Sequence, residues 1–255
     1  MSTEIDDLKS IVALDEVSDS EAKKFGDTTL TFDGLLDEPG VVVFEDAGQL
    51  GCGSIVWHVA TILSQFVIDR KFSQTCKNIL ELGSGTGLVG LALGLYEKQR
   101  REKAGEPPLT DQDLKIYITD QDILLDRMKK NVELNGLQGI VEAEVLSWGE
   151  PLPAFADSEQ LAKLSPPVPP VDLVLMADCV YAEPAFPLLE KTLLDLTDRD
   201  PDLKMYMSYQ KRRKADARFF KHMKKSFTFN EITDYPGYDH SVRGTMHLYK
   251  ITRKK

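Results

Sequence analysis

The sequence predicts an α/β fold built on one open, doubly wound sheet of seven strands, mostly parallel and with the last strand antiparallel. Short apolar runs alternate with segments of helical periodicity from about residue 76 onward. A glycine-rich turn joins the first of these runs to a helix, as in nucleotide-binding α/β domains. The last two runs leave no room for a helix between them, so the final strand should reverse direction.

An N-terminal β-hairpin and a helix are expected before this sheet. Two β-rich runs, Thr28–Phe32 and Val41–Phe44, flank a turn rich in Gly, Pro and Asp. The next segment has an apolar helical face from Ile55 to about Ile68, and Ser54 can serve as its N-cap. We therefore expect a single domain over residues 25–255, with the hairpin and helix at 25–70.

The sheet itself is expected within a core at residues 76–255, whose elements follow one another as strand and helix. Residues 149–170 contain six prolines, which predicts an extended loop insertion. The run 171–177 is continuously apolar, as in a strand buried on both faces. Strands are expected at 79–82, 114–119, 140–146, 171–177, 203–209, 226–232 and 243–252, and helices at 88–101, 123–135, 185–197 and 212–224.

Charge is unevenly distributed along the chain. The formal charge is −10, and residues 1–50 alone hold 13 Asp and Glu against 3 Lys and Arg. Residues 1–24 are therefore expected to form an acidic, partly disordered arm, with docking to a basic protein surface as the second interpretation. A balance of this kind argues against nucleic acid as the main partner.

Several classes of protein are disfavoured by the absence of their signals. Three cysteines lack C-x-x-C spacing and four histidines are scattered, so no metal site is expected. The first residues show no secretory signal, and no run is long and apolar enough to span a membrane. We expect a cytoplasmic monomer with reduced thiols.

The strongest local signal is the glycine run Glu81-Leu-Gly-Ser-Gly-Thr-Gly87. Glycines after a strand let the backbone approach a ligand, and the following helix offers free N–H groups. By itself this run is compatible with NAD, FAD, phosphates or a tight turn. Leu88 stands where the dinucleotide fingerprint needs glycine, however, and no G-K-[ST] is present.

Two residues at strand ends extend this candidate site. Asp120 ends the second core strand, where a carboxylate can accept hydrogen bonds from both ribose hydroxyls of an adenosine; it could instead cap the next helix. Trp148 follows the third strand, where an indole can stack on adenine or pack at the sheet edge.

A third constellation follows the buried fourth strand, at Ala177-Asp-Cys-Val-Tyr181. An acid and an aromatic hydroxyl three residues apart are expected at the carboxyl edge of the sheet, where the reactive end of a cofactor would lie. A turn-forming Asp and a half-buried Tyr are the simpler interpretation.

These motifs together resemble the seven-β-strand methyltransferases that depend on S-adenosyl-L-methionine, and most closely their non-SET protein-lysine branch. The resemblance covers residues from about 50 to 210. Its motifs are Glu81–Gly87, the acidic position Asp120, the D-x-x-Y signature Asp178–Tyr181, the segment Gly53–Trp57 and the W-G element around Trp148. His58 stands where the branch often has proline.

The resemblance implies a Rossmann-like fold and a defined set of site residues. Asp178 and Tyr181 would be catalytic, with Asp178 orienting the incoming amine and Tyr181 lining the lysine channel. The cofactor would be held by Trp57, Glu81, Gly83, Ser84, Gly85, Asp120, Trp148 and Ala177. The layout is most similar to small fungal members acting on translation elongation factor 1-alpha, which implies a protein substrate.

Other functions remain open on the sequence. A nucleic-acid methyltransferase would commonly carry a Pro-Pro-aromatic motif after strand four, and Asp178–Tyr181 contains no proline. A small-molecule methyltransferase, an NAD-dependent oxidoreductase and a non-catalytic cofactor-binding protein are the further alternatives. A basic run, Lys211–Lys225, is interpreted as a solvated helix face, with docking to an acidic partner surface as the second interpretation; it does not have the pattern of a nucleic-acid footprint.

Overall fold

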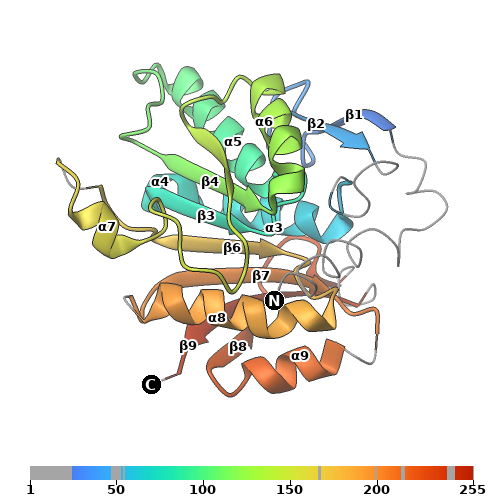
Figure 1. Cartoon of the computed structure of the whole chain (residues 1–255). Helices are drawn as coiled ribbons and strands as arrows, with labels where there is room; N and C mark the ends of the chain where they lie inside the picture. Colours follow the sequence, from blue (N-terminus) through green and yellow to red (C-terminus); the bar gives the residue numbers. More distant parts are fainter. Residues whose placement is uncertain are drawn as a thin grey trace.

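The computed structural model describes residues 25–46, 53, 55–165, 168–198, 200–213, 216–239 and 245–254. The predicted acidic arm at 1–24, Ser54 and part of the Pro-rich segment lie outside these residues. The predicted doubly wound sheet is confirmed: seven strands lie in the order β5-β4-β3-β6-β7-β9-β8 (Figure 1). These strands are β3 Asn78–Leu82, β4 Lys115–Asp120, β5 Val141–Val145, β6 Leu173–Ala177, β7 Lys204–Gln210, β8 Phe227–Glu231 and β9 Met246–Arg253.

The strand order creates a switch point beside β3. The chain runs outward from β3 to β4 and β5, then returns to place β6 on the other side of β3. All these neighbours are parallel, whereas β9 pairs antiparallel with both β7 and β8. The predicted reversal of the last strand is therefore confirmed. Ligands of such sheets bind at the carboxyl ends of the strands where the order reverses.

Alternating side chains of the central strands fill two apolar layers. On β3, Ile79 belongs to the layer under the helices before and after this strand, and Leu80 belongs to the opposite layer. Helices α3 His58–Asp69, α5 Leu88–Ala104 and α6 Leu125–Leu134 cover the first face, and α8 Phe186–Thr197 and α9 Asp216–Met223 cover the second (Figure 1). Both faces of the central strands are thus buried, as their apolar sequences require.

The N-terminal hairpin is confirmed as a separate two-stranded sheet, β1 Phe25–Leu30 with β2 Val41–Asp46. It is fixed to α6 by two asparagines. The Asn131 Oδ1 accepts a hydrogen bond from the Phe44 N–H at 2.9 Å, and the Asn135 side chain bonds both backbone groups of Val42. Asn131 also donates to the Thr86 carbonyl at 2.9 Å. One buried side chain therefore joins the hairpin to the glycine turn.

The helix that carries the upstream tryptophan begins later than predicted. It starts at His58 rather than Ile55, with Trp57 as an extended N-cap residue. The Val56 N–H donates to the buried Glu45 carboxylate of β2 at 2.7 Å. This bond holds the backbone before α3 outside the helix, and Ile55 is buried without being helical.

The other short elements differ from the prediction in specific places. The insertion at 149–170 contains a helix, α7 Ser158–Ala162, whose first N–H groups are capped by the Asp157 carboxylate. The short helix α4 Phe72–Thr75 was not anticipated. Two 3₁₀ turns, η2 Asp122–Leu124 and η3 Glu183–Ala185, begin the helical segments that continue as α6 and α8.

Helix α9 starts four residues later than predicted. Residues 211–213 are not helical, and the helix begins at Asp216. The Asp216 carboxylate accepts hydrogen bonds from the N–H groups of Arg212 and Arg213, each at 3.2 Å. The basic run is consequently divided: Arg212 and Arg213 lie between β7 and α9, whereas Arg218 and Lys221 lie on α9.

Candidate functional site

The turn between β3 and α5 is shaped by three glycines that have left-handed backbone conformations. The φ angles are +62° at Gly83, +54° at Gly85 and +80° at Gly87. An added Cβ at Gly83 would lie 2.8 Å from the Trp148 ring, and one at Gly85 would lie 2.6 Å from the Gly53 carbonyl oxygen. Larger residues are excluded by both conformation and space. The turn therefore presents bare backbone at the switch point of the sheet.

Backbone and side-chain hydrogen bonds attach this turn to the end of β4. Ser84 and Thr119 are joined twice: the Ser84 N–H donates to the Thr119 carbonyl, and the Thr119 N–H donates to the Ser84 Oγ, each at 2.9 Å. The Gly85 N–H donates to Asp120 Oδ2 at 2.8 Å. Asp120 is thereby placed beside the glycine turn, as the sequence predicts.

Asp120 retains acceptor capacity for a ligand. Its Oδ1 accepts from the Gln121 N–H at 2.8 Å, so each carboxylate oxygen has one described donor and a second lone pair. Burial raises the pKa of this carboxyl group, and the two N–H donors oppose that effect. Because a bound ribose would add donors to the ionised form, binding would lower this pKa.

Glu81 lies deeper than the other predicted cofactor residues. Its side chain is buried, and its Oε2 accepts from the Gly90 N–H at 2.8 Å. Burial raises the pKa of Glu81 to about 8, although hydrogen bonds from Gly90 and Val89 act in the opposite direction. In the structure this carboxyl group joins β3 to the first turn of α5. It therefore fixes the two elements between which the glycine turn lies.

The two tryptophans border different parts of the site. Trp148 follows β5, is half-buried, and has its ring against Gly83. Trp57 immediately precedes α3, and the Arg212 guanidinium lies over its ring at 4.9 Å from the centroid. Trp148 is thus placed at the cofactor turn, and Trp57 is placed beside the segment that follows β7.

Asp178 occupies an uncommon backbone conformation directly after β6. Its φ angle is +58°, in the left-handed region that Asp tolerates better than most residues. Its N–H donates to the Ser208 carbonyl at 2.9 Å, which continues the pairing of Ala177 with Ser208. The side chain is buried, and its Oδ2 lies 2.5 Å from Arg212 Nη2. A carboxylate is therefore held at the carboxyl edge by backbone and by charge.

Two consecutive arginines, which the sequence interpretation assigned to a solvated helix, fix the D-x-x-Y loop. Arg212 pairs with Asp178, and Arg213 Nη2 donates to the Tyr181 carbonyl oxygen. The Tyr181 side chain is half-buried. The missed signal was positional: both arginines follow β7, whose carboxyl end lies beside that of β6, so they could have been expected at the same edge.

Cys179 connects the D-x-x-Y loop to the glycine turn. Its thiol is buried and lies 3.3 Å from the Leu82 carbonyl, to which it donates. An added Cβ at Gly83 would approach its sulfur to 3.1 Å. Burial and nearby carboxylates raise its pKa well above the ordinary thiol value. This thiol is a packing group rather than a nucleophile.

These residues fit a cofactor that contains a nucleoside, because the two ribose hydroxyls of a nucleoside can donate hydrogen bonds to an acidic side chain. The turn supplies bare glycine backbone, Asp120 supplies a carboxylate beside it, and the Trp148 ring lies against Gly83. Ala177 ends β6 next to this edge. Among the residues that the structure describes, no group of three or more His, Cys, Asp or Glu could hold a metal ion.

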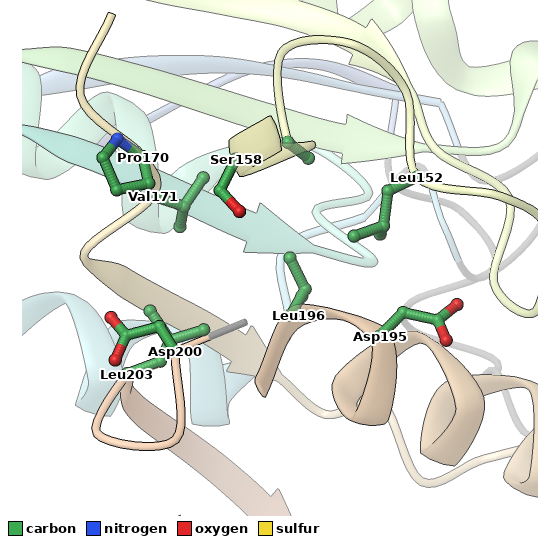
Figure 2. A pocket seen from close by; sticks show the side chains of 9 residues that line it. Leu152, Ser158, Pro170, Val171, Asp195, Leu196, Asp200 and Leu203 are labelled. Carbon is green, nitrogen blue, oxygen red and sulfur yellow. The ribbon is translucent and has the colours of Figure 1, made fainter. Parts of the chain in front are cut away.

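A separate pocket lies at the opposite ends of β6 and β7. Its volume is about 200 Å³, and Val171 and Leu203, which precede these two strands, are in its lining (Figure 2). In Figure 2 the carboxylates of Asp195 and Asp200 point away from the apolar side chains between them. The residues that line this pocket do not include Asp120, Trp148, Asp178 or any residue of the glycine turn, so it is not the candidate active site. None of the described helices is long and apolar enough to cross a bilayer.

Comparisons with known proteins show the family of this chain. A profile of the lysine methyltransferase family matches residues 35–226. The chain is 43% identical over 240 residues to the Saccharomyces cerevisiae protein-lysine N-methyltransferase EFM6, covering 90% of this chain and 92% of that protein. It is 29% identical over 214 residues to the Danio rerio protein N-lysine methyltransferase METTL21A, with 83% and 82% of the two chains covered.

Among solved structures, a ribosomal protein L11 methylase from Lactobacillus delbrueckii subsp. bulgaricus has a TM-score of 0.46 and 18% identity, with 79% of this chain and 81% of that chain covered. A likeness at that level says nothing about activity. The family match decides among the cofactors that the glycine turn alone left open. The chain belongs to the lysine methyltransferase family and is an enzyme that uses S-adenosylmethionine.

Proposed function

We propose that this enzyme transfers a methyl group from S-adenosylmethionine to a lysine side chain of a protein, and that this protein is translation elongation factor 1-alpha. The observation that supports an amine acceptor best is Asp178, a buried carboxylate at the carboxyl edge of the sheet. The next residue, Cys179, lies beside Gly83 of the glycine turn, and its thiol donates to the Leu82 carbonyl. A fixed negative charge next to a cofactor turn suits a substrate nitrogen.

The cofactor would be held by the residues that the sequence motifs indicate. Asp120 would accept hydrogen bonds from the ribose hydroxyls, and the Trp148 ring would contact the adenine. The glycine backbone would lie against the other groups of the cofactor. Glu81 and Ser84 would keep the turn in place, because their described hydrogen bonds go to α5 and β4. The full set is Trp57, Glu81, Gly83, Ser84, Gly85, Asp120, Trp148 and Ala177.

Bound S-adenosylmethionine would supply an electrophilic methyl group, whose transfer would exchange a C–S bond for a C–N bond and release one proton from the amine to solvent. The chain's own part is to present a neutral, aligned nitrogen. Asp178 orients the amine by accepting its N–H, and Tyr181 lines the lysine channel and hydrogen-bonds the nitrogen. Lysine, with a pKa of about 10.4, is about one part in 2,500 neutral at pH 7, which costs about 4.6 kcal/mol.

The choice of elongation factor 1-alpha rests on the resemblance to small fungal members of the branch. The yeast relative EFM6 is named a protein-lysine N-methyltransferase, which supports a protein acceptor. We also propose that the enzyme acts in the cytoplasm as a monomer and does not act on nucleic acid.

The test is incubation with radiolabelled S-adenosylmethionine, first with a cell extract lacking the enzyme and then with purified elongation factor 1-alpha. We expect one labelled band, and mass spectrometry should place the label on a lysine of that factor. The Asp178→Ala variant serves as the control for enzyme-dependent labelling. Label on a different protein would refute the proposed substrate, and label confined to RNA or small molecules would refute the proposed reaction.

A further inference from the structure

Arg212 is held at three points around the predicted amine site. Its Nη2 lies 2.5 Å from Asp178 Oδ2 and 3.1 Å from Gln210 Oε1, and its guanidinium stacks over the Trp57 ring. Its side chain is 21% exposed and that of Asp178 is 7% exposed. This ion pair is mostly buried and has contacts from three segments, so it is less screened by solvent than most surface pairs.

This pairing creates a physical conflict for a substrate lysine. If Asp178 stood alone, its negative charge would stabilise an ammonium ion and raise the pKa of the amine, which opposes methyl transfer. Because Arg212 binds the same carboxylate, an incoming ammonium group would lie within a few ångströms of the guanidinium cation. A like charge disfavours the ammonium form, and this is a known way to obtain a neutral, nucleophilic lysine.

Building on the function proposed above, we infer that Arg212 is a positioning residue that lowers the pKa of the substrate amine. It holds Asp178 so that the carboxylate accepts one N–H of the amine, and its positive charge keeps the nitrogen from retaining a third proton. The third proton passes to solvent water before transfer, so the nitrogen lone pair is available to form the C–N bond. Each unit by which this pKa falls increases the neutral fraction about tenfold.

Two titratable groups beside this pair, Asp216 and Tyr209, are bonded to each other. Asp216 is buried and accepts from the Tyr209 hydroxyl at 2.9 Å and from the Arg212 N–H. Burial and the nearby Asp216 raise the pKa of Tyr209 far above the range in which the enzyme would be assayed. The chain segments that meet at this edge also carry Glu81, Asp120, Cys179, Tyr181, Lys211, Arg213 and, at the start of α3, His58; β9, which pairs with β7, adds His247 and Tyr249.

The test compares the pH dependence of kcat for the wild type, Arg212→Gln and Arg212→Lys with saturating cofactor. Loss of the charge in Arg212→Gln should move the rising limb of the kcat profile upward by about one pH unit and lower kcat at pH 7.5 about tenfold. KM for the protein substrate should not rise, because Asp178 is then free to bind an ammonium. Arg212→Lys should restore most of the wild-type profile.

A matched control is Arg218→Gln, since Arg218 lies on α9 and forms an exposed ion pair with Glu183 at 2.7 Å. Its profile should superimpose on that of the wild type. Arg212→Met, which places an uncharged, unbranched side chain beside Trp57, replaces the glutamine variant if that protein does not bind S-adenosylmethionine. A uniform fall in kcat without a shifted profile, or a rise in KM, would overturn the inference and leave only a structural role. Absence of lysine methylation by the wild type would instead refute the proposed function itself.

Discussion

The two halves of the candidate active site are built in different ways. The half beside β3 and β4 is made mainly of backbone. Glycines in left-handed conformations form the turn, which is attached to β4 by the bonds between Ser84 and Thr119 and by the bond from the Gly85 N–H to the Asp120 carboxylate. The half beside β6 and β7 is instead built on an ion pair between Asp178, which follows β6, and Arg212, which follows β7. Backbone geometry suits a constant cofactor, whereas a charge pair can be tuned to the nitrogen that is to be methylated.

The largest expected effect comes from removing the charge on the β6 side. Asp178→Ala should lower the rate of methyl transfer by about 10²–10⁴-fold, because the amine loses the group that orients it. Cofactor affinity should stay within a few fold, since the described contacts of Asp178 are with β7 and Arg212. Turnover assays check the expected loss of rate, and calorimetric titration with S-adenosylmethionine checks the expected cofactor affinity. Turnover equal to that of the wild type would remove Asp178 from the catalytic residues.

A substitution in the glycine turn should have the opposite signature. In Gly85→Ala the new Cβ would lie 2.6 Å from the Gly53 carbonyl at a φ angle of +54°. We expect the dissociation constant for the cofactor to rise about tenfold to a hundredfold, and the free energy of unfolding to fall by about 1–3 kcal/mol.

The matched control for this substitution is Gly105→Ala. Gly105 also has a positive φ angle, +65°, but nothing lies within 4 Å of an added Cβ. Backbone strain alone should lower its stability by about 1 kcal/mol and leave cofactor affinity unchanged. Equal cofactor affinities in the two variants would show that the shape of the turn does not govern binding.

The effect expected at Glu81 is on stability rather than on activity or cofactor affinity, and it appears in the dependence of stability on pH. Burial raises its pKa in the folded protein to about 8, above the ordinary value of 4.5. The folded state therefore holds a proton that the unfolded state has released, and its contribution to stability is lost as pH rises through that interval. Stability should fall by up to about 1.4 kcal/mol per pH unit there.

Glu81→Gln should flatten this slope, as measured by chemical unfolding between pH 5 and 8. The control is Glu106→Gln, because the nearby Arg100 lowers the pKa of Glu106 and removes it from the titrating range. That variant should keep the wild-type slope. A slope unaffected by the Glu81 substitution would assign the pH dependence to other groups.

The sequence predicts the cofactor half of the site better than the substrate half, for a physical reason. Gly83, Gly85 and Asp120 lie at strand ends whose position follows from periodicity, so their meeting at the carboxyl edge could be inferred. The pairing of Arg212 with Asp178 depends on β7 lying beside β6 and on α9 starting only at Asp216. Helical periodicity over a basic run does not carry that information.

The remaining differences have similar causes, with one exception. The start of α3 is displaced by a bond from Val56 to Glu45 of the hairpin, which is a tertiary contact that local sequence does not show. The helix α7, in contrast, has a local signal: Asp157 precedes Ser158-Glu-Gln160 and caps the first N–H groups. The surrounding prolines obscured a capping pattern that was readable in the sequence.

The asparagine of α6 that bonds both the hairpin and the glycine turn gives the small N-terminal sheet a wider importance. Through Asn131 the hairpin is coupled to the Thr86 carbonyl, and through Glu45 it is coupled to the segment that carries Trp57. Although the hairpin lies outside the seven-stranded sheet, it is bonded to segments on both sides of the candidate site. Sequence variation in β2 can therefore alter the spacing between methyl donor and acceptor without touching either one.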